Sequence, residues 1–412
     1  KGFLFMRRGD FSQAADIFRN TLNYAEELPS EEKKKYIPEL KRSLAIVYRM
    51  QGEYNTALAW FSEAMAGFQT IQDELGIFKV LLGVARIHSL RGEWNKATNT
   101  YNQVIESYSY RKPDQWLLAT YSELVDSLLA AGDYSKAKEM LDKVNDLLEE
   151  VDLVTEKDEN IHLSFQIQFI RFYQNEKNFE LALKEIQKVW DQFNALEEKE
   201  IDLELNILKT EIEILLDLDR CDDARKKLEA LFPNLKSDWM KATYWQLMGI
   251  LEQREMNLGS AKSALERAIV KSKEIGHYQL LVRSRILYAT LLVDQAKLGS
   301  QSAFQKADDY LKEIETEMKD QQMTPRVLDC QILRATLASL QKDYDSAYQL
   351  LSDVGETAKE NNLYQQQSRA QNQLDLLEQE QGQLKEATRK VDTLSVFRYL
   401  DDARRLVDEH GS

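Results

Sequence analysis

Gln51-Gly52-Glu53-Tyr54-Asn55-Thr56-Ala57 is the stretch that decides the fold, because the chain repeats its pattern from end to end. The pattern is a Gly, Asn or acidic turn, an aromatic or apolar residue, two polar residues and then alanine. The apolar residue and the alanine recur at Phe11/Ala14, Tyr54/Ala57, Trp94/Ala97, Tyr134/Ala137, Phe179/Ala182, Cys221/Ala224, Leu258/Ala261, Phe304/Ala307, Tyr344/Ala347 and Leu384/Ala387. Nine intervals span the 373 residues from Phe11 to Leu384, a period of about 41 residues. Such a period without a strand signal predicts a solenoid of helical hairpins.

Each repeat has the apolar spacing of two helices. Around the quoted stretch, apolar residues fall at steps of three and four, as on one face of a helix: Tyr54, Ala57, Leu58, Phe61, Ala64, Met65 and Phe68. Leu40, Leu44, Val47 and Tyr48 indicate the helix before it. Gly52 suits the turn because glycine takes positive φ without steric cost. The alanine is expected where the two helices cross, because a larger side chain would separate them.

The five prolines are expected between hairpins, where a missing N–H and a fixed φ disturb a helix least. They are Pro29, Pro38, Pro113, Pro233 and Pro325. No change of composition divides the chain, so residues 1–394 are predicted to form one solenoid. Residues 395–412 carry a narrow apolar stripe of Val396, Leu400, Ala403 and Val407. This segment is predicted to be a capping helix, or else a junction to a further domain.

Composition excludes several classes of function. The net charge of −15 argues against nucleic acid as a direct partner, because phosphate binding requires a basic surface. No apolar stretch is long enough to span a membrane, so we expect a cytoplasmic protein. The two cysteines, Cys221 and Cys330, are far apart in sequence and are expected to be small core residues rather than a disulfide or a metal site.

We expect no enzymatic activity, no cofactor and no metal. The chain has no glycine-rich phosphate loop of the Gly-x-x-x-x-Gly-Lys type. Its four histidines are separated by long stretches, and no Cys/His spacing suits a metal ion. Pairs of acidic residues are too common in this composition to single out an acid–base site.

The pattern resembles the tetratricopeptide repeat family over essentially the whole chain. The matching residues in the second unit are Ala45, Tyr48, Ala57, Phe61 and Ala64. In the seventh unit, Trp245-Gln246-Leu247-Met248-Gly249 is similar to the family's first-helix signature, and Ala261 and Ala268 follow it. The usual repeat is about 34 residues, so this chain resembles the family's long-helix variants. The resemblance implies an all-α, right-handed superhelix of about ten antiparallel hairpins.

In the family, the first helix of each hairpin lines a concave groove that binds peptides or partner helices. Carried over by register, the resemblance places five basic residues on that surface: Arg42, Arg49, Lys79, Arg86 and Arg171. Later units offer polar, nearly neutral residues there, among them Asn206, Lys209, Glu213 and Gln246. An arginine fork matches a carboxylate or a phosphate. The alternative for these arginines is solvated charge paired along the helix, for example with Glu39.

Two functions compete at this stage. The first is a non-enzymatic scaffold or adaptor that binds an acidic or phosphorylated segment of a partner protein in the concave groove. The second is an effector-sensing domain of a multidomain signalling or transcription regulator that binds a small ligand. Assembly through the convex surface, including self-association, also remains open.

The crossing alanines provide a test of the repeat register. Replacing Ala57, Ala97 or Ala137 with leucine is expected to lower the free energy of unfolding by about 1–3 kcal/mol through overpacking. Chemical denaturation of each variant measures the change. A loss below a few tenths of a kcal/mol in two of the three variants would show that the register is wrong.

Overall fold

A computed structural model describes residues 1–8, 10–108, 115–131, 133–150, 156–197, 201–231, 235, 238–299, 301–361 and 363–382. All regular structure in this part of the chain is helical. The helices are α1 (Gly2–Arg8), α2 (Phe11–Ala25), α3 (Ser30–Met50), α4 (Tyr54–Thr70), α5 (Glu74–Arg91), α6 (Trp94–Tyr108), α7 (Gln115–Ala131), α8 (Tyr134–Glu150), α9 (Glu156–Asn175), α10 (Phe179–Ala195), α11 (Ile201–Asp217), α12 (Cys221–Leu231), α13 (Asp238–Arg254), α14 (Leu258–Glu274), α15 (Tyr278–Lys297), α16 (Gln301–Asp320), α17 (Thr324–Leu340) and α18 (Tyr344–Glu360). A further helix occupies residues 364–382.

The repeated sequence pattern marks the second helix of each hairpin. Tyr54, Trp94 and Phe179 are the first residues of α4, α6 and α10, and the pattern's apolar residue begins most of the other second helices. The alanine three residues later is fully buried in each of the nine copies that the structure describes: Ala14, Ala57, Ala97, Ala137, Ala182, Ala224, Ala261, Ala307 and Ala347. The predicted all-α solenoid is confirmed. Its tenth copy, at Leu384, and the predicted cap at 395–412 lie outside the described residues.

The turn inside the hairpin has the same conformation at the positions compared, even where its glycine is replaced. Gly52 and Gly92 have φ of 82° and 74°, in the left-handed region that glycine adopts freely. Lys177, Asp219 and Met256 occupy the equivalent position, two residues before the next helix, with φ between 56° and 61°. The following N–H donates to a carbonyl five residues back, as from Glu53 to Tyr48 at 2.9 Å. The turn geometry therefore persists where the sequence motif is degraded.

One proline prediction is wrong. Pro29 precedes α3 and Pro325 lies in the first turn of α17, as expected, but Pro38 lies inside α3. The helix continues through it because the packing of α3 on α4 outweighs one missing backbone hydrogen bond. Gly67 of α4 makes room for the ring, since a Cβ there would lie 2.5 Å from the Pro38 Cγ. Pro113 and Pro233 lie outside the described residues.

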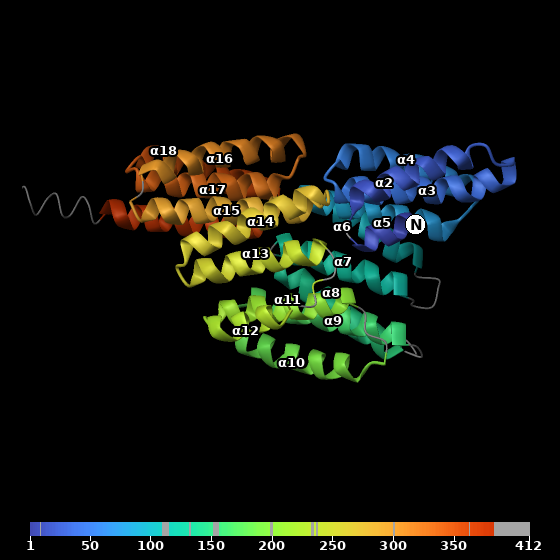
Figure 1. Cartoon of the computed structure of the whole chain (residues 1–412), viewed down its shortest axis with the longest axis horizontal. Helices are drawn as coiled ribbons and strands as arrows, with labels where there is room; N and C mark the ends of the chain where they lie inside the picture. Colours follow the sequence, from blue (N-terminus) through green and yellow to red (C-terminus); the bar gives the residue numbers. More distant parts are fainter. Residues whose placement is uncertain are drawn as a thin grey trace, which may run out of the picture.

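The solenoid curves until its C-terminal hairpins meet its N-terminal ones. In Figure 1 the chain runs from the blue helices α2–α5 through the green α8–α12 and back up to the orange α15–α18. The Phe11 N–H donates to the Ile275 carbonyl at 3.2 Å, and the Phe11 ring contacts His277 edge-on at 5.4 Å. A Cβ on Gly52 would lie 2.2 Å from the Tyr278 Cγ, so this turn rests directly on the start of α15.

The same contact recurs at the next two hairpins. Gly92 packs on Pro325 at the start of α17, where an added Cβ would lie 2.5 Å from the proline Cδ. Gln365 donates to the Leu129 carbonyl at 3.0 Å, at the C-terminal end of α7. We call this line of contacts the seam. Because the seam joins the N-terminal and C-terminal hairpins, the concave surface lines a partly enclosed space, which we call the chamber.

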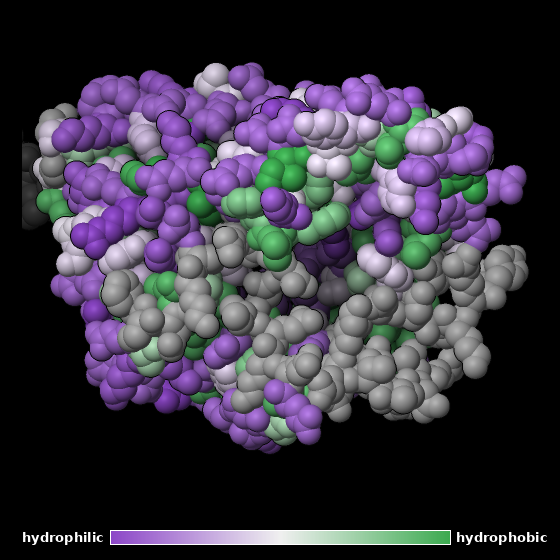
Figure 2. Space-filling model, turned by 45° about the vertical axis from the view of Figure 1, so that its right-hand side comes forward, coloured by the Kyte–Doolittle hydropathy of each residue, from purple (hydrophilic) through white to green (hydrophobic). Residues whose placement is uncertain are grey.

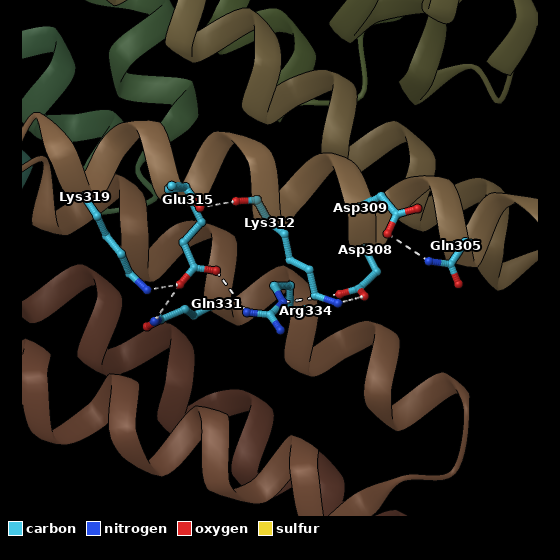
Figure 3. Close-up of polar contacts among 9 residues, drawn as sticks. Gln305, Asp308, Asp309, Lys312, Glu315, Lys319, Gln331 and Arg334 are labelled. Carbon is cyan, nitrogen blue, oxygen red and sulfur yellow. Dashed lines mark hydrogen bonds and ion pairs between the residues drawn. The ribbon is translucent and has the colours of Figure 1, made fainter.

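Buried charges in the C-terminal hairpins are fully paired. Figure 3 shows Glu315 of α16, which is 4% exposed, together with Lys319 at 2.7 Å and Arg334 of α17 at 3.0 Å. Arg334 also contacts Asp308 at 3.3 Å. Burial of an ion is tolerated when such partners replace its water. This network is the standard against which the charges of the chamber are compared below.

Gly52 tests the seam. Gly52→Ala is expected to lower the free energy of unfolding by about 3 kcal/mol, because the methyl group strains a left-handed residue and clashes with Tyr278. Gly299→Ala is the matched control, since Gly299 has φ of 88° and nothing within 4 Å of an added Cβ. The control isolates the backbone strain, about 1–2 kcal/mol. Equal losses in urea denaturation would mean that Tyr278 does not press on this turn.

Candidate functional site

The chamber contains two connected hollows. The first hollow has a volume of about 640 Å³ and is lined by Met6, Phe11, Ile46, Arg49, Met50, Leu205, Asn206, Lys209, Trp239, Thr243, Gln246, His277, Gln279, Leu280 and Arg283. These residues come from the N-terminal hairpins (6–50) and from the middle of the chain (205–283), so the hollow depends on the contacts of the seam. Figure 2 shows a view in which the molecule is hollowed near its middle, with hydrophilic residues in the depth and hydrophobic residues along part of the rim.

The first hollow is cationic although the protein is acidic. Its lining includes Arg49, Lys209 and Arg283 and no aspartate or glutamate. Arg283 forms an ion pair with Glu213, which does not line the hollow, at 2.6 Å. Within the described part of the chain, Arg49 and Lys209 have neither an ion pair nor a side-chain hydrogen bond, and the Arg49 Nε is buried without a partner. These two positive charges therefore have no ion-pair partner among the described residues, although Glu213 attracts Lys209 from beyond ion-pair distance.

The protein surroundings penalise both charges. Burial, together with the charge of the nearby Arg86, lowers the pKa of Arg49 to about 10. Burial likewise lowers the pKa of Lys209 to about 8, against the attraction of Glu213. Burial alone would raise the pKa of Glu213, yet Lys209 and Arg283 bring it down to about 2. The carboxylate thus stays ionised at every ordinary pH, while the two free cations are held in an unfavourable setting.

His277 lies between the seam and the first hollow. It is the N-cap of α15, where its Nδ1 accepts from the Leu280 N–H at 3.4 Å. Burial lowers its pKa to about 4, and the charges of Arg49 and Lys209 contribute in the same direction. Because both cations lower the pKa of the same imidazole, their charges act on the same region of the hollow.

The rest of the first hollow is apolar with a few amides. Phe11 and Trp239 are among the aromatic and aliphatic residues of its wall. The Gln246 amide nitrogen donates to the Ser284 Oγ at 2.8 Å, but the Gln246 Oε1 is buried without a donor. Asn206 accepts from Arg171 at 2.7 Å through its Oδ1, so its amide N–H groups are left to donate. The site therefore offers cations, an apolar wall, an amide oxygen that can accept a hydrogen bond and amide N–H groups that can donate one.

The second hollow, of about 580 Å³, shares Arg49, Met50, Gln279 and Arg283 with the first. Its charges are mostly compensated, since Arg86 contacts Glu123 at 2.5 Å. Its other lining residues are Ser89, Leu90, Trp94, Tyr101, Asp126, Ser127, Val282, Met323, Pro325, Arg326, Gln365 and Gln366. The two hollows join at these shared residues, so that Arg49 lies where they meet and Lys209 lies in the first hollow.

The five basic residues named from the sequence do not all lie in one site. Arg49 and Arg86 line the hollows. Arg171 lies beside them, 3.4 Å from Asp126. Arg42 is bonded to Glu39 on its own helix, and Lys79 lies over the Trp116 ring at 4.8 Å; neither lines a hollow.

Sequence reasoning placed Lys209 on the inner surface but assigned it to a nearly neutral half of the groove. It missed Trp239, His277 and Arg283 as site residues. His277 and Arg283 follow the α14–α15 turn and reach the site only through closure of the seam, for which the repeat pattern contains no signal. The arrangement brings Arg49 of an early unit and Lys209 of a middle unit into the lining of the same hollow.

Among the described residues, no group of His, Cys, Asp or Glu side chains could hold a metal ion. The same part of the chain has no helix long and apolar enough to cross a bilayer. Both cysteines are free thiols, with Cys330 buried and Cys221 half-buried.

Residues 36–109 match the sequence model of the tetratricopeptide repeat family. A Rap protein complexed with Competence and Sporulation Factor is similar in structure, with a TM-score of 0.58 and 13% identity over 89% of this chain and 97% of that one. A tetratricopeptide repeat protein from Parabacteroides merdae (TM-score 0.43, 15% identity, 69% and 96% covered) and yeast Tom70 (0.42, 13%, 92% and 95%) are more distant. The search of curated proteins found no match.

The fold and the repeat thus define a helical-repeat solenoid. Residues 36–109 carry the sequence pattern of the tetratricopeptide repeat family, and helical hairpins continue along the rest of the described chain, in a fold similar to that of the Rap protein.

His277 makes the stability of the fold depend on pH. Its folded pKa of about 4 lies below the ordinary value of 6.5, so the fold favours the neutral ring. The stability it contributes is complete above pH 6.5 and is lost as the pH falls toward 4, on the order of 3 kcal/mol. His277→Asn keeps a capping acceptor but does not titrate. Urea denaturation should show a smaller loss between pH 6.5 and 4 in this variant; equal losses would assign the pH dependence to other groups.

Proposed function

We propose that this chain is a non-enzymatic protein-interaction scaffold that holds an acidic or phosphorylated segment of a partner in its chamber. The observation that carries the proposal is the pair of uncompensated cations, Arg49 and Lys209, in a hollow without a carboxylate. The similar Rap protein is a precedent for this fold in complex with a factor. The polar groups of the hollow are cations, amides, the Thr243 hydroxyl and the His277 imidazole, and the proposal assigns them to binding.

Binding of an anion would remove the electrostatic cost of the two unpaired cations in the free protein. An uncompensated cation in low-dielectric surroundings is costly, and an incoming anion forms charge-assisted hydrogen bonds with it. The two cations are already partly desolvated in the free protein. Most of the attraction to a bound anion therefore contributes to affinity. The apolar wall around Phe11 and Trp239 would receive side chains next to the anionic group.

A small anionic effector is the second candidate. The first hollow, at about 640 Å³, lies within the roughly 300–1,000 Å³ of small-molecule sites, and it combines an apolar wall with a few polar groups as such sites do. The elongated second hollow favours the longer ligand, because a small molecule would leave it empty.

Neutralising the two free cations tests the proposal. The probe is a short acetylated oligo-glutamate peptide with a fluorophore, and the measurement is fluorescence anisotropy. Arg49→Gln or Lys209→Gln is expected to weaken binding about 10–100-fold, the equivalent of one lost charged hydrogen bond. Neither change should destabilise the fold, because each removes an uncompensated charge.

The matched controls are Arg42→Gln, on the same helix as Arg49, and Lys79→Gln. Both were named from the sequence, and both lie outside the hollows, so they should bind the probe as the unmodified protein does. Absence of binding by the unmodified protein, or equal losses in controls and site variants, would contradict the proposal.

A further inference from the structure

We propose that the first hollow is a site for a phosphomonoester, carried on a phosphorylated residue of the partner segment. This rests on the proposed function and narrows it, because a carboxylate and a phosphate differ in charge, in shape and in titration. The charges, the donors and the walls of the hollow each bear on the choice.

The charge count favours the phosphate. Around the first hollow, Arg283 is balanced by Glu213, Arg86 by Glu123 and Arg171 by Asp126. Arg49 and Lys209 remain, which is two positive charges. A carboxylate would neutralise one of them and leave the other buried and unpaired. A phosphomonoester carries about −1.5 to −2 charges at pH 7 and neutralises both.

The donors also suit a group with three terminal oxygens. Arg49 offers a planar fork, and Lys209 offers an ammonium that can reach an oxygen from another direction. The amide N–H groups of Asn206, whose oxygen is already engaged by Arg171, add neutral donors beside them. A carboxylate offers about four lone-pair sites on two oxygens in one plane. A phosphomonoester offers three oxygens around a tetrahedral centre, which suits donors that come from the two helices α3 and α11.

The walls indicate that the phosphate is attached to a longer molecule. Phe11, Leu205 and Trp239 line the same hollow as the cations, and a bare phosphate would leave them in contact with water. Gln246 Oε1, buried and without a donor, could accept a backbone N–H from a bound segment. The second hollow continues from Arg49 and Gln279 and would receive the residues that follow.

The experiment compares three peptides of one apolar sequence that carry phosphoserine, glutamate or serine at the same position. Binding to the full chain is measured by isothermal titration calorimetry. The phosphoserine peptide is expected to bind at least about tenfold more tightly than the glutamate peptide, and the serine peptide to bind weakest. Arg49→Gln and Lys209→Gln should each reduce this preference, while Arg42→Gln should keep it.

The pH profile provides an independent readout. Affinity for the phosphoserine peptide should fall below about pH 6, where the phosphate gains a proton, and above about pH 8, where the unliganded Lys209 loses one. The charged groups that act on Lys209 are Glu213 of α11, Arg283 of α15, Arg171 of α9 and Asp126 of α7. The glutamate peptide should bind equally well down to about pH 5, because its carboxylate stays ionised there.

The outcomes separate the two proposals. Equal affinity for the phosphoserine and glutamate peptides, with no loss between pH 6 and 5, overturns the phosphate site and leaves the acidic-segment scaffold standing. No binding of either peptide overturns both. Inorganic phosphate and free phosphoserine serve as competitors: if they bind as tightly as the phosphopeptide, the phosphomonoester site holds but its source is a small molecule rather than a partner segment.

Discussion

The structure depends on one constraint, which is that no hairpin can bury its apolar face without a neighbour. The fully buried alanines, Ala57 among them, let the two helices of each hairpin approach closely, and each hairpin then packs on the next. Because every interface repeats the same geometry, a small rotation accumulates into a continuous curve. The curvature is thus a property of the interface between repeats.

The seam converts this curve into an enclosure. Gly52 and Gly92 serve two purposes, since each ends a helix in the left-handed conformation and each lacks the side chain that would collide with Tyr278 or Pro325. The residues just before Gly52, Arg49 and Met50, line the hollows. After Tyr278, the hollows are also lined by Gln279, Leu280, Val282 and Arg283. The contacts that close the seam therefore also bring together the residues that line the hollows.

Enclosure also changes the energetic cost of a charged side chain. In an open groove, Arg49 and Lys209 would be solvated and nearly neutral in effect, as exposed ions are. In the chamber they lose water without gaining a carboxylate, in contrast to Glu315 and Arg334, which satisfy each other between α16 and α17. A protein with net charge −15 retains two unpaired cations at its centre. That imbalance is the observation on which the proposed anion site rests.

The amino-acid sequence by itself determined the hairpins, their period, their turns and the class of protein, because these follow from contacts between residues near in sequence. It also placed Arg49, Arg86 and Lys209 on inner faces, since helical register is local. It could not distinguish Arg49 from Arg42, which lies on the same helix but pairs with Glu39. Nor could it bring His277 and Arg283 to Arg49. Only the tertiary structure decided these points, because small rotations summed over successive repeats set which distant residues meet.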